Sequence, residues 1–345
     1  MANSLRWVLG ILTGLLSLLV ILVGGELLVR FAAPQPYLYP RWQYSGDYGH
    51  VLYSGTTMVH AMPRHFEYRY GINSLGYRGR RVPISNHYVR QNIVILGDSY
   101  SFGTGVQDGE EFSVVMERAL GTDFETINLA VGGWGLPQQI RRFYEFGILY
   151  QPRVVILQFC ANGLTDGLRH RVARIENDRF VFQSTKSDRG WLRDQLSKSV
   201  LQRSQLYNLL RQFLYDRFDG GLVLDARVGR RPPAGVMEAA TAPTAMESAY
   251  LELLSAFALD LRQRGIPLLV ISVNGQLEGY PALVAGVARL NEAGTLHYVD
   301  VRPWFDGVTA YESPEGHSWG IKAHAILGAQ LAEQVRALQS QRGPD

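Results

Sequence analysis

Hydrophobic and polar positions divide the chain into three stretches with different patterns. The first is apolar from Trp7 to Val29 except for Ser, Thr, Gly and one acid, Glu26. The second is rich in Tyr, Pro, Gly and His and has weak periodicity, whereas in the third short apolar runs alternate with segments of helical spacing. The pattern predicts an N-terminal anchor at 1–32, a linker and lead-in segment at 33–90, and an α/β domain at 91–340.

The first stretch is long enough to cross a membrane. Its apolar run of about 23 residues exceeds the roughly 20 that a hydrocarbon core of about 30 Å requires. A cleavable signal peptide has a shorter apolar core and a small-x-small exit, whereas here Arg30 precedes the only candidate exit, Phe31-Ala32-Ala33. We therefore predict an uncleaved transmembrane signal anchor that places the rest of the chain outside the cytoplasm. A buried core helix, the alternative, would not need such length without charges.

The third stretch predicts five strands buried on both faces of a parallel sheet, the first beginning at Ile93. With helices between them, they form a three-layer α/β/α sandwich. The block 168–243 is longer than an ordinary connection and is predicted to be an insertion or lid with a helix at 191–218. The other strands are predicted at 124–129, 154–159, 267–273 and 296–301, and the other helices at 110–120 (with Asp108 as N-cap), 137–150, 244–264, 281–291 and 320–339.

Composition narrows the possible functions. The chain of 345 residues is 46% hydrophobic and 19% charged, as expected of a globular protein. A formal charge of +3 without a basic run gives no reason to expect a nucleic-acid partner. The single cysteine, Cys160, excludes an intramolecular disulfide framework and is expected to be a packed small hydrophobe. The eight histidines include no H-x-x-x-H pair, so we expect neither a metal nor a cofactor.

Candidate catalytic residues follow the ends of the predicted strands. The first strand ends at Gly97-Asp98-Ser99, and open α/β sheets bind their ligands at this edge. Ser99 is either a nucleophile or a helix cap. A glycine cluster follows the second strand and Asn162 the third, while His317 precedes the last helix. Serine, glycine N–H groups, an amide and a histidine are the components of acyl transfer through a tetrahedral intermediate.

These blocks resemble the SGNH (GDSL-type) hydrolase superfamily. Gly97-Asp98-Ser99-Tyr100, Asn128 through Gly133, Asn162 and His317 match its four blocks in order, and the resemblance covers about residues 65–340. The lead-in Asn73-Ser-Leu-Gly-Tyr-Arg78 and the anchor resemble membrane-attached bacterial members. The resemblance implies a flavodoxin-like five-stranded parallel sheet, and a single-pass protein of the bacterial inner membrane with a periplasmic catalytic domain.

The resemblance also implies residue roles. Ser99 would attack an ester carbonyl and His317 would remove its proton, while the N–H groups of Ser99 and Gly133 and the Asn162 side chain would hold the oxyanion. The family commonly has an aspartate three residues before its histidine, where this chain has Pro314. Glu315 is the candidate acid instead. The alternatives are a Ser99–His317 dyad beside an exposed Glu315, or a more distant acid such as Asp306.

Further residues near these blocks are open to two interpretations. Tyr100 and Trp134 flank the site and are candidates for stacking on a sugar ring, with aromatic packing as the alternative. His324, on the predicted last helix, is expected to be structural. Lys322 stands where the family usually has glycine, so the turn before that helix departs from the family pattern.

The resulting prediction is a membrane-anchored serine esterase that hydrolyses small acyl esters, with O-acetyl groups of a carbohydrate as the expected substrate. The carbohydrate part follows from the family resemblance, because a fold alone does not determine a substrate. One alternative is an O-acetyltransferase that modifies an extracytoplasmic polysaccharide through the same acyl-enzyme. Another is a non-catalytic polysaccharide-assembly module with a relict site.

Overall fold

The computed structural model describes residues 2–164, 172–177, 179–184, 190–217 and 245–340. Its centre is a sheet of five parallel strands in the order β12-β11-β8-β6-β7. Counted along the chain from the β7 edge, this is the 2-1-3-4-5 order of the flavodoxin-like fold, so the predicted fold class is confirmed. The strands are β6 (Gln91–Leu96), β7 (Phe124–Asn128), β8 (Val154–Phe159), β11 (Leu268–Ser272) and β12 (His297–Val299).

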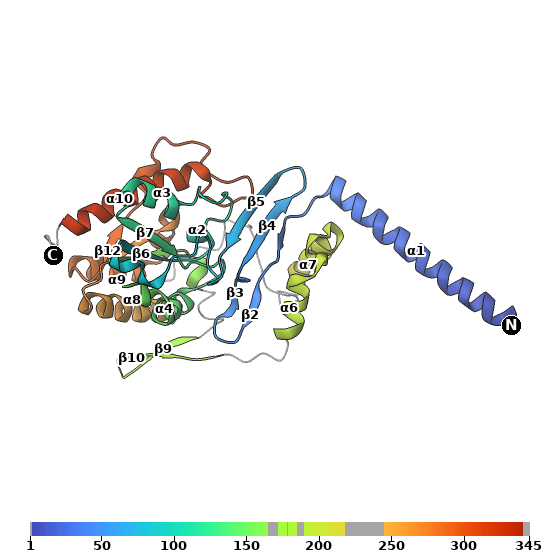
Figure 1. Ribbon diagram of the computed structural model, residues 1–345, viewed down its shortest axis with the longest axis horizontal. Coiled ribbons are helices and arrows are strands. Elements are labelled where there is room, and N and C mark those ends of the chain that lie inside the picture. The colour runs from blue at the N-terminus through green and yellow to red at the C-terminus, as the bar shows by residue number, and fades with distance from the viewer. Residues whose placement is uncertain (1, 165–171, 178, 185–189, 218–244, 341–345) are drawn as a thin grey trace.

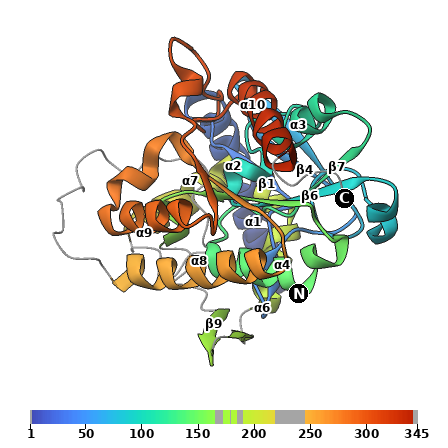
Figure 2. The same cartoon turned by 90° about the vertical axis from the view of Figure 1, so that its left-hand side faces the viewer.

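Helices cover both faces of the sheet and complete three layers (Figure 2). Val94 and Leu96 of β6 lie in the core shared with α4, α8 and α9, and Ile93 and Ile95 in the core shared with α3 and α10. Successive strand residues point to opposite faces, so Ile93–Leu96 of β6 are all apolar because both faces of the strand are covered. The helices are α3 (Phe112–Leu120), α4 (Leu136–Glu145), α8 (Ala245–Gln263), α9 (Pro281–Glu292) and α10 (Ile321–Ser340).

Two of the predicted helices are divided in the structure. The helix predicted at 137–150 becomes α4 and the 3₁₀ turn η2 (Gly147–Tyr150). The helix predicted at 191–218 is interrupted because Ser199 and Ser204 have extended backbones, and Ser199 Oγ accepts the Leu201 N–H. It becomes α6 (Gly190–Lys198), the 3₁₀ turn η3 (Val200–Arg203) and α7 (Gln205–Arg217). Much of the predicted insertion at 168–243 lies outside the described residues.

Residues 33–90, predicted as a linker and lead-in segment, contain five short antiparallel strands. They form a three-stranded sheet, β1-β4-β5, and a β2-β3 hairpin, which lie between the parallel-sheet domain and the N-terminal helix (Figure 1). Their side chains are mostly half-buried, so the sequence has no clean alternation. The strands are β1 (Tyr37–Tyr39), β2 (Gln43–Ser45), β3 (Gly49–Val51), β4 (Thr56–Met62) and β5 (Phe66–Ile72), followed by the 3₁₀ turn η1 (Ile84–Tyr88). A further hairpin, β9 (Ala173–Glu176) and β10 (Arg179–Phe182), was not predicted either.

Asp108 does not cap the helix that follows it, as the sequence had suggested. Helix α3 begins after Glu111, which is the N-cap residue and makes no side-chain capping bond. The Asp108 carboxylate instead accepts the Gly71 N–H at 2.7 Å and the Arg78 Nε–H at 3.0 Å. It therefore joins the N-terminal strands to the domain rather than starting a helix.

Arg78 makes the strongest connection between the lead-in segment and the domain. Its guanidinium is fully buried and donates to the carbonyl oxygens of Phe102, Gly103 and Val106 at 2.6–2.9 Å. These three residues belong to the segment that follows β6, the first strand of the parallel sheet: Phe102 ends the helix α2 (Ser99–Phe102), and Gly103 and Val106 lie in the loop after it. A buried cation must be fully hydrogen-bonded to be tolerated, so this loop and the lead-in segment fold as one unit.

The N-terminal helix α1 (Ala2–Ala32) has 31 residues and projects from the rest of the molecule (Figure 1). Within it, Leu5–Ala32 contains an 18-residue window with a mean hydropathy of 2.5, and none of that window is buried against protein. By length and composition this segment can cross a membrane.

Acidification is expected to destabilise the fold through His324 of α10. Its Nδ1 accepts the Phe112 N–H at 3.0 Å, and burial lowers its pKa from 6.5 to about 3. Between these values the unfolded chain binds the proton more readily, so the contribution of neutral His324 to stability is full above pH 6.5 and is lost as the pH falls towards 3. We expect the Tm to fall by several degrees between pH 7 and pH 4.5.

In His324→Asn, whose amide oxygen can accept the same N–H without titrating, the Tm should depend less on pH. Equal slopes in the two proteins would contradict this role.

Candidate active site

Ser99 lies at the carboxyl end of β6, as the first residue of the short helix α2 (Ser99–Phe102). This helix is capped by Asp98, whose carboxylate accepts the Tyr100 N–H at 3.0 Å. The capping role that was the alternative for Ser99 is therefore filled by its neighbour. The Ser99 hydroxyl is directed elsewhere, with its Oγ 3.1 Å from His317 Nε2.

The other side of the His317 ring faces Glu315. Nδ1 lies 2.8 Å from one carboxylate oxygen and 2.6 Å from the other. The Ser99 hydroxyl, the His317 imidazole and the Glu315 carboxylate thus form one hydrogen-bonded series. It joins a residue that follows β6 to two residues of the loop before α10. Of the acids weighed from the sequence, Glu315 is the one in contact with the ring, while Asp306 is exposed.

Charge at Glu315 sets the tautomer of His317. Burial alone would raise the pKa of this carboxyl, but the His317 imidazole and its hydrogen bond outweigh burial and lower the pKa from 4.5 to about 2. An ionised carboxylate can only accept hydrogen bonds. Neutral His317 therefore carries its proton on Nδ1 and leaves Nε2 free to accept the Ser99 hydroxyl proton. This is the tautomer that a general base requires.

A tight turn allows an acid only two residues before the histidine to reach its ring. Gly316 has a φ of 104°, in the region open to glycine. The Ser313 N–H donates to the His317 carbonyl oxygen at 2.9 Å, and the Ser313 hydroxyl donates to Glu315 Oε1 at 2.6 Å. The turn thus folds the carboxylate back onto the imidazole. Lys322, the other departure from the family pattern, is exposed and donates to the Thr309 carbonyl oxygen at 3.3 Å.

Gly105→Ala is expected to lower kcat by about 10–100-fold, because displacement of a catalytic group by about 1 Å costs this much. Gly105 has a φ of 88°, and a Cβ there would lie 2.6 Å from Ser313 Oγ and closer still to Glu315 Oε1. The matched control is Gly294→Ala, which also has a positive φ but open space around a Cβ. Steady-state kinetics and the Tm of both variants test this. An equal loss of activity in the two would show that only backbone strain matters.

Two residues of the N-terminal sheet, His60 and Tyr70, lie behind the acid, and sequence analysis assigned neither of them a role. His60 of β4 is buried, and burial lowers its pKa to about 4, although the Glu315 charge acts against this. Its Nδ1 lies 3.2 Å from the Tyr70 hydroxyl, which accepts the Gly105 N–H at 3.0 Å. The Glu315 side chain is only 1% exposed, and this exclusion of water strengthens its interaction with His317.

The predicted oxyanion donors lie at the carboxyl ends of β7 and β8. In the turn after β7, a Cβ on Gly132 would lie 3.6 Å from Ser99 Cβ, and Gly133 has a φ of 79°. Asn162 follows β8 and is exposed, and its neighbour Gly163 lies against Gly135. The structure therefore brings both predicted donor segments to the same sheet edge, and the turn after β7 lies directly beside Ser99. Their role as oxyanion donors stays a prediction.

The N-terminal β2-β3 hairpin builds one wall of this site. His50 Nε2 donates to the Gly132 carbonyl oxygen at 2.8 Å, and Trp42 packs on Gly132. The indole of Trp134 donates to the His50 carbonyl oxygen at 2.9 Å and stacks on Tyr48 with ring centroids 4.9 Å apart. Trp134 is only 1% exposed. Substrate stacking, suggested for Trp134 from the sequence, does not fit, because both its polar group and its ring are engaged in packing.

Tyr100 and Cys160, which the sequence also places near the site, lie in packed surroundings as well. Tyr100 meets the His317 ring edge-on, with centroids 5.1 Å apart, and also packs on Trp319. It is half-buried and supports the imidazole from one side. Cys160 is buried and lies 3.2 Å from Gln276 Oε1, consistent with packing rather than nucleophilic chemistry.

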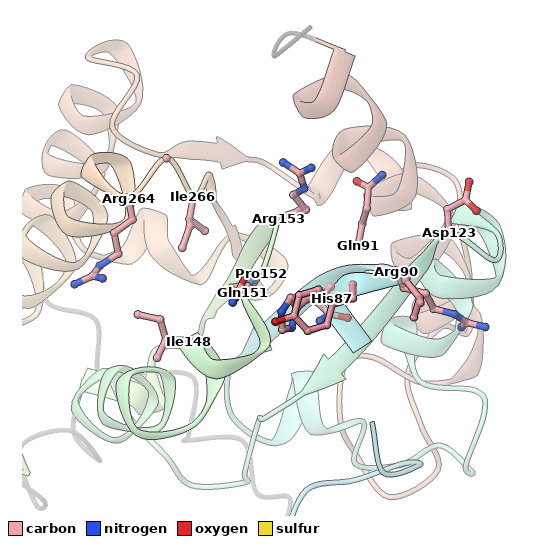
Figure 3. Close-up of a pocket in the computed structure, with 14 residues that line it drawn as sticks. His87, Arg90, Gln91, Asp123, Ile148, Gln151, Pro152, Arg153, Arg264 and Ile266 are labelled. Atoms are coloured by element: carbon pink, nitrogen blue, oxygen red, sulfur yellow. The ribbon is translucent and has the colours of Figure 1, made fainter. Parts of the chain in front are cut away.

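A pocket of about 680 Å³ lies at the opposite edge of the sheet (Figure 3). It is lined by the first residues of β6 and by Pro152 and Arg153, which precede β8. The carboxyl ends of these strands carry Ser99 and Asn162, so the pocket is not part of the candidate active site.

Neither a family model nor a curated protein matches this sequence. Similar solved structures include the psychrotrophic esterase EstA from Pseudoalteromonas sp., with 13% identity and a TM-score of 0.41 over 72% of this chain and 99% of that one. The lipase/acylhydrolase from Enterococcus faecalis has 12% identity and a TM-score of 0.39 over 72% and 96%. An aryl esterase from M. smegmatis has 13% identity and a TM-score of 0.36 over 72% and 99%.

Other similar structures are described as lipolytic proteins of the G-D-S-L family or GDSL-like lipases. These descriptions fall in the family that the sequence blocks resemble. The activity and the substrate depend on the geometry around Ser99.

Proposed function

We propose that this protein is a serine hydrolase that cleaves carboxylic esters through an acyl-enzyme intermediate. The observation that carries the proposal is the hydrogen-bonded series from Ser99 through His317 to Glu315, at the sheet edge where α/β folds bind ligands. A nucleophile that contacts a base, which is itself oriented by a buried carboxylate, is the geometry of activated serine chemistry.

In the first half-reaction, Ser99 Oγ attacks the carbonyl carbon while its proton passes to His317 Nε2. The Glu315 carboxylate stabilises the imidazolium that forms. The oxyanion accepts hydrogen bonds from the N–H groups of Ser99 and Gly133 and from the Asn162 side chain. Collapse of the tetrahedral intermediate breaks the bond to the alcohol, which leaves with the proton held on His317.

In the second half-reaction a water molecule takes the place of the alcohol. His317 Nε2 removes a proton from the water as its oxygen attacks the acyl carbon of the Ser99 ester. The second tetrahedral intermediate releases the carboxylic acid, and Ser99 Oγ recovers its proton from His317. None of these steps calls for a cofactor.

For the substrate we propose a short acyl ester, with the O-acetyl group of a carbohydrate as the class to test first. The support is the resemblance of the Asn73–Arg78 lead-in and the N-terminal apolar helix to membrane-attached members of the superfamily. Rates on p-nitrophenyl acetate, butyrate and octanoate, and acetate release from acetylated oligosaccharides, test this proposal. A preference for octanoate together with no acetate release would exclude it.

The same acyl-enzyme could transfer its acyl group to a sugar hydroxyl instead of water. The test adds non-acetylated oligosaccharide to the p-nitrophenyl acetate assay. Hydrolysis that is unaffected by the sugar, with no acetylated product by mass spectrometry, excludes the transferase. Faster turnover with an acetylated sugar product would replace the hydrolase proposal with it.

For the location we propose a single-pass protein of the bacterial inner membrane, anchored by α1 with its catalytic domain in the periplasm. The supporting observation is the 18-residue apolar window within Leu5–Ala32, none of which is covered by protein. Protease added to spheroplasts should digest the domain, while a domain protected until the membrane is lysed would place it in the cytoplasm.

A further inference from the structure

Helix α7 is joined to the N-terminal helix by a half-buried hydrogen-bond network centred on Glu26. The Glu26 carboxylate accepts the N–H groups of Gln205 and Leu206 at 3.0 Å and the Ser204 hydroxyl at 2.8 Å. It therefore satisfies the otherwise unpaired N–H groups at the start of α7. A Cβ on Gly25 would lie 3.3 Å from the Leu206 side chain. Glu26 and Gly25 thus fix α7 beside the last turns of α1 (Figure 1).

The end of α1 is also fixed to the N-terminal sheet. The Arg64 guanidinium, in the turn between β4 and β5, donates to the carbonyl oxygens of Arg30 and Phe31 at 3.1 and 2.7 Å. These are carbonyls that the end of a helix leaves without partners. Helix α1 is therefore held from two sides, so α7 has a defined position relative to the apolar segment.

The side of α7 that meets α1 continues as an exposed apolar surface. Leu206, Leu210 and Phe213 follow helical spacing along one face. Leu206 packs on α1, whereas Leu210 is 55% and Phe213 61% exposed. The adjoining turn η3 adds Val200 and Leu201, which are 73% and 48% exposed. We call Val200, Leu201, Leu209, Leu210 and Phe213 the α7 apolar surface.

The position of this surface along α1 matches the edge of a bilayer. Leu5–Ala32 spans 28 residues, about 42 Å at 1.5 Å per residue, whereas the hydrocarbon core measures about 30 Å. About two turns of α1 therefore extend into the headgroup region. Gly25, Glu26 and Arg30 lie in the final turns, as expected where charged groups meet water. The α7 apolar surface begins at that level.

We propose that α7 and η3 form an interfacial membrane-binding element, with the α7 apolar surface buried in the lipid bilayer that α1 crosses. The occupant is lipid because this surface is continuous with the apolar face of α1 at Gly25 and Leu206, and an amphipathic helix at this depth places its apolar side among the acyl chains. The proposal rests on α1 crossing a membrane and is independent of the esterase activity. The element formed by α7 and η3 would hold the parallel-sheet domain in one orientation above the bilayer.

The test uses the full chain in vesicles of phosphatidylethanolamine and phosphatidylglycerol, with or without brominated phosphatidylcholine. In a Cys160→Ala background, Leu210→Cys and Phe213→Cys each carry an environment-sensitive fluorophore. The matched control is Leu259→Cys on α8, an exposed leucine (47%) on a helix that packs on α4, α9 and β11 of the parallel-sheet domain. Leu16→Cys marks the inside of the proposed span.

Labels at positions 210 and 213 should lose about half or more of their fluorescence to brominated lipid and resist aqueous iodide, while the label at 259 should respond only to iodide. Iodide quenching at 210 and 213 equal to that at 259 would overturn the proposal. Protection from both quenchers would also overturn it, because protein would then cover the surface. If the label at position 16 is not quenched by lipid, α1 is outside the bilayer and the proposal fails with it.

Discussion

Replacing Ser99 with alanine is expected to lower kcat for ester hydrolysis by about 10⁴-fold or more, since the nucleophile of a serine triad contributes on this scale. Among the described residues, only the Ser99 hydroxyl is hydrogen-bonded to His317 Nε2, so none of the others is placed to act as the nucleophile. The fold should be unaffected because the cap of α2 is supplied by Asp98. The measurement is steady-state turnover of p-nitrophenyl acetate, with circular dichroism to check folding.

A covalent probe separates catalysis from binding in the same variant. A fluorophosphonate should label the wild type at Ser99, with loss of fluoride, and should not label Ser99→Ala. Ser101→Ala is the matched control, two residues further along, because its hydroxyl makes no hydrogen bond in the structure. If the wild type is not labelled, or if Ser99→Ala keeps its turnover, the protein is a non-catalytic module or uses another nucleophile.

Replacing Glu315 with glutamine is expected to lower kcat by about 10⁴-fold while KM changes little, because the carboxylate orients His317 and does not touch the substrate. Both Glu315 oxygens accept hydrogen bonds, from His317 Nδ1, from the His317 N–H and from Ser313. An amide turns one acceptor into a donor and removes the charge. The imidazole then loses its preference for a proton on Nδ1, and Nε2 is no longer held ready as a base.

Two variants distinguish this orienting role from general damage to the loop. Glu312→Gln makes the same change at an exposed acid three residues earlier and should keep turnover near that of the wild type. Glu315→Asp retains the charge and should recover part of the activity lost in Glu315→Gln. Turnover of Glu315→Gln within about ten-fold of the wild type would indicate that a Ser99–His317 dyad suffices.

The sequence carried most of the information about the central sheet and the catalytic pair. The strand β6 contains the continuous apolar run Ile93–Leu96, and the carboxyl ends of strands meet at one edge in any parallel sheet. Ser99, Asn162 and His317 could therefore be placed near one another before any coordinates were considered. The choice of acid could not be made in the same way, because it depends on the left-handed backbone of Gly316, which no periodicity encodes.

The parts that sequence analysis missed depend on contacts between distant segments. Strands β1, β2 and β3 have three residues each, too few for an alternating pattern to be detected. The burial of Trp134 follows from stacking on Tyr48 and from a hydrogen bond to His50, both far away along the chain. The only available signal was the density of Tyr and His in 33–90, which is unusual for a linker.

The buried position of Arg78 changes where the chain can be divided. A version lacking residues 1–32 keeps His50, Trp42 and His60, and with them the wall of the site and the surroundings of Glu315. A version beginning at residue 91 loses all of these and leaves the carbonyls of the loop after Ser99 without their cation. Separating this protein from its N-terminal helix is therefore a matter of cutting before Tyr37. Residues 33–90 therefore fold with the parallel-sheet domain, and the two parts can only be kept or exchanged together.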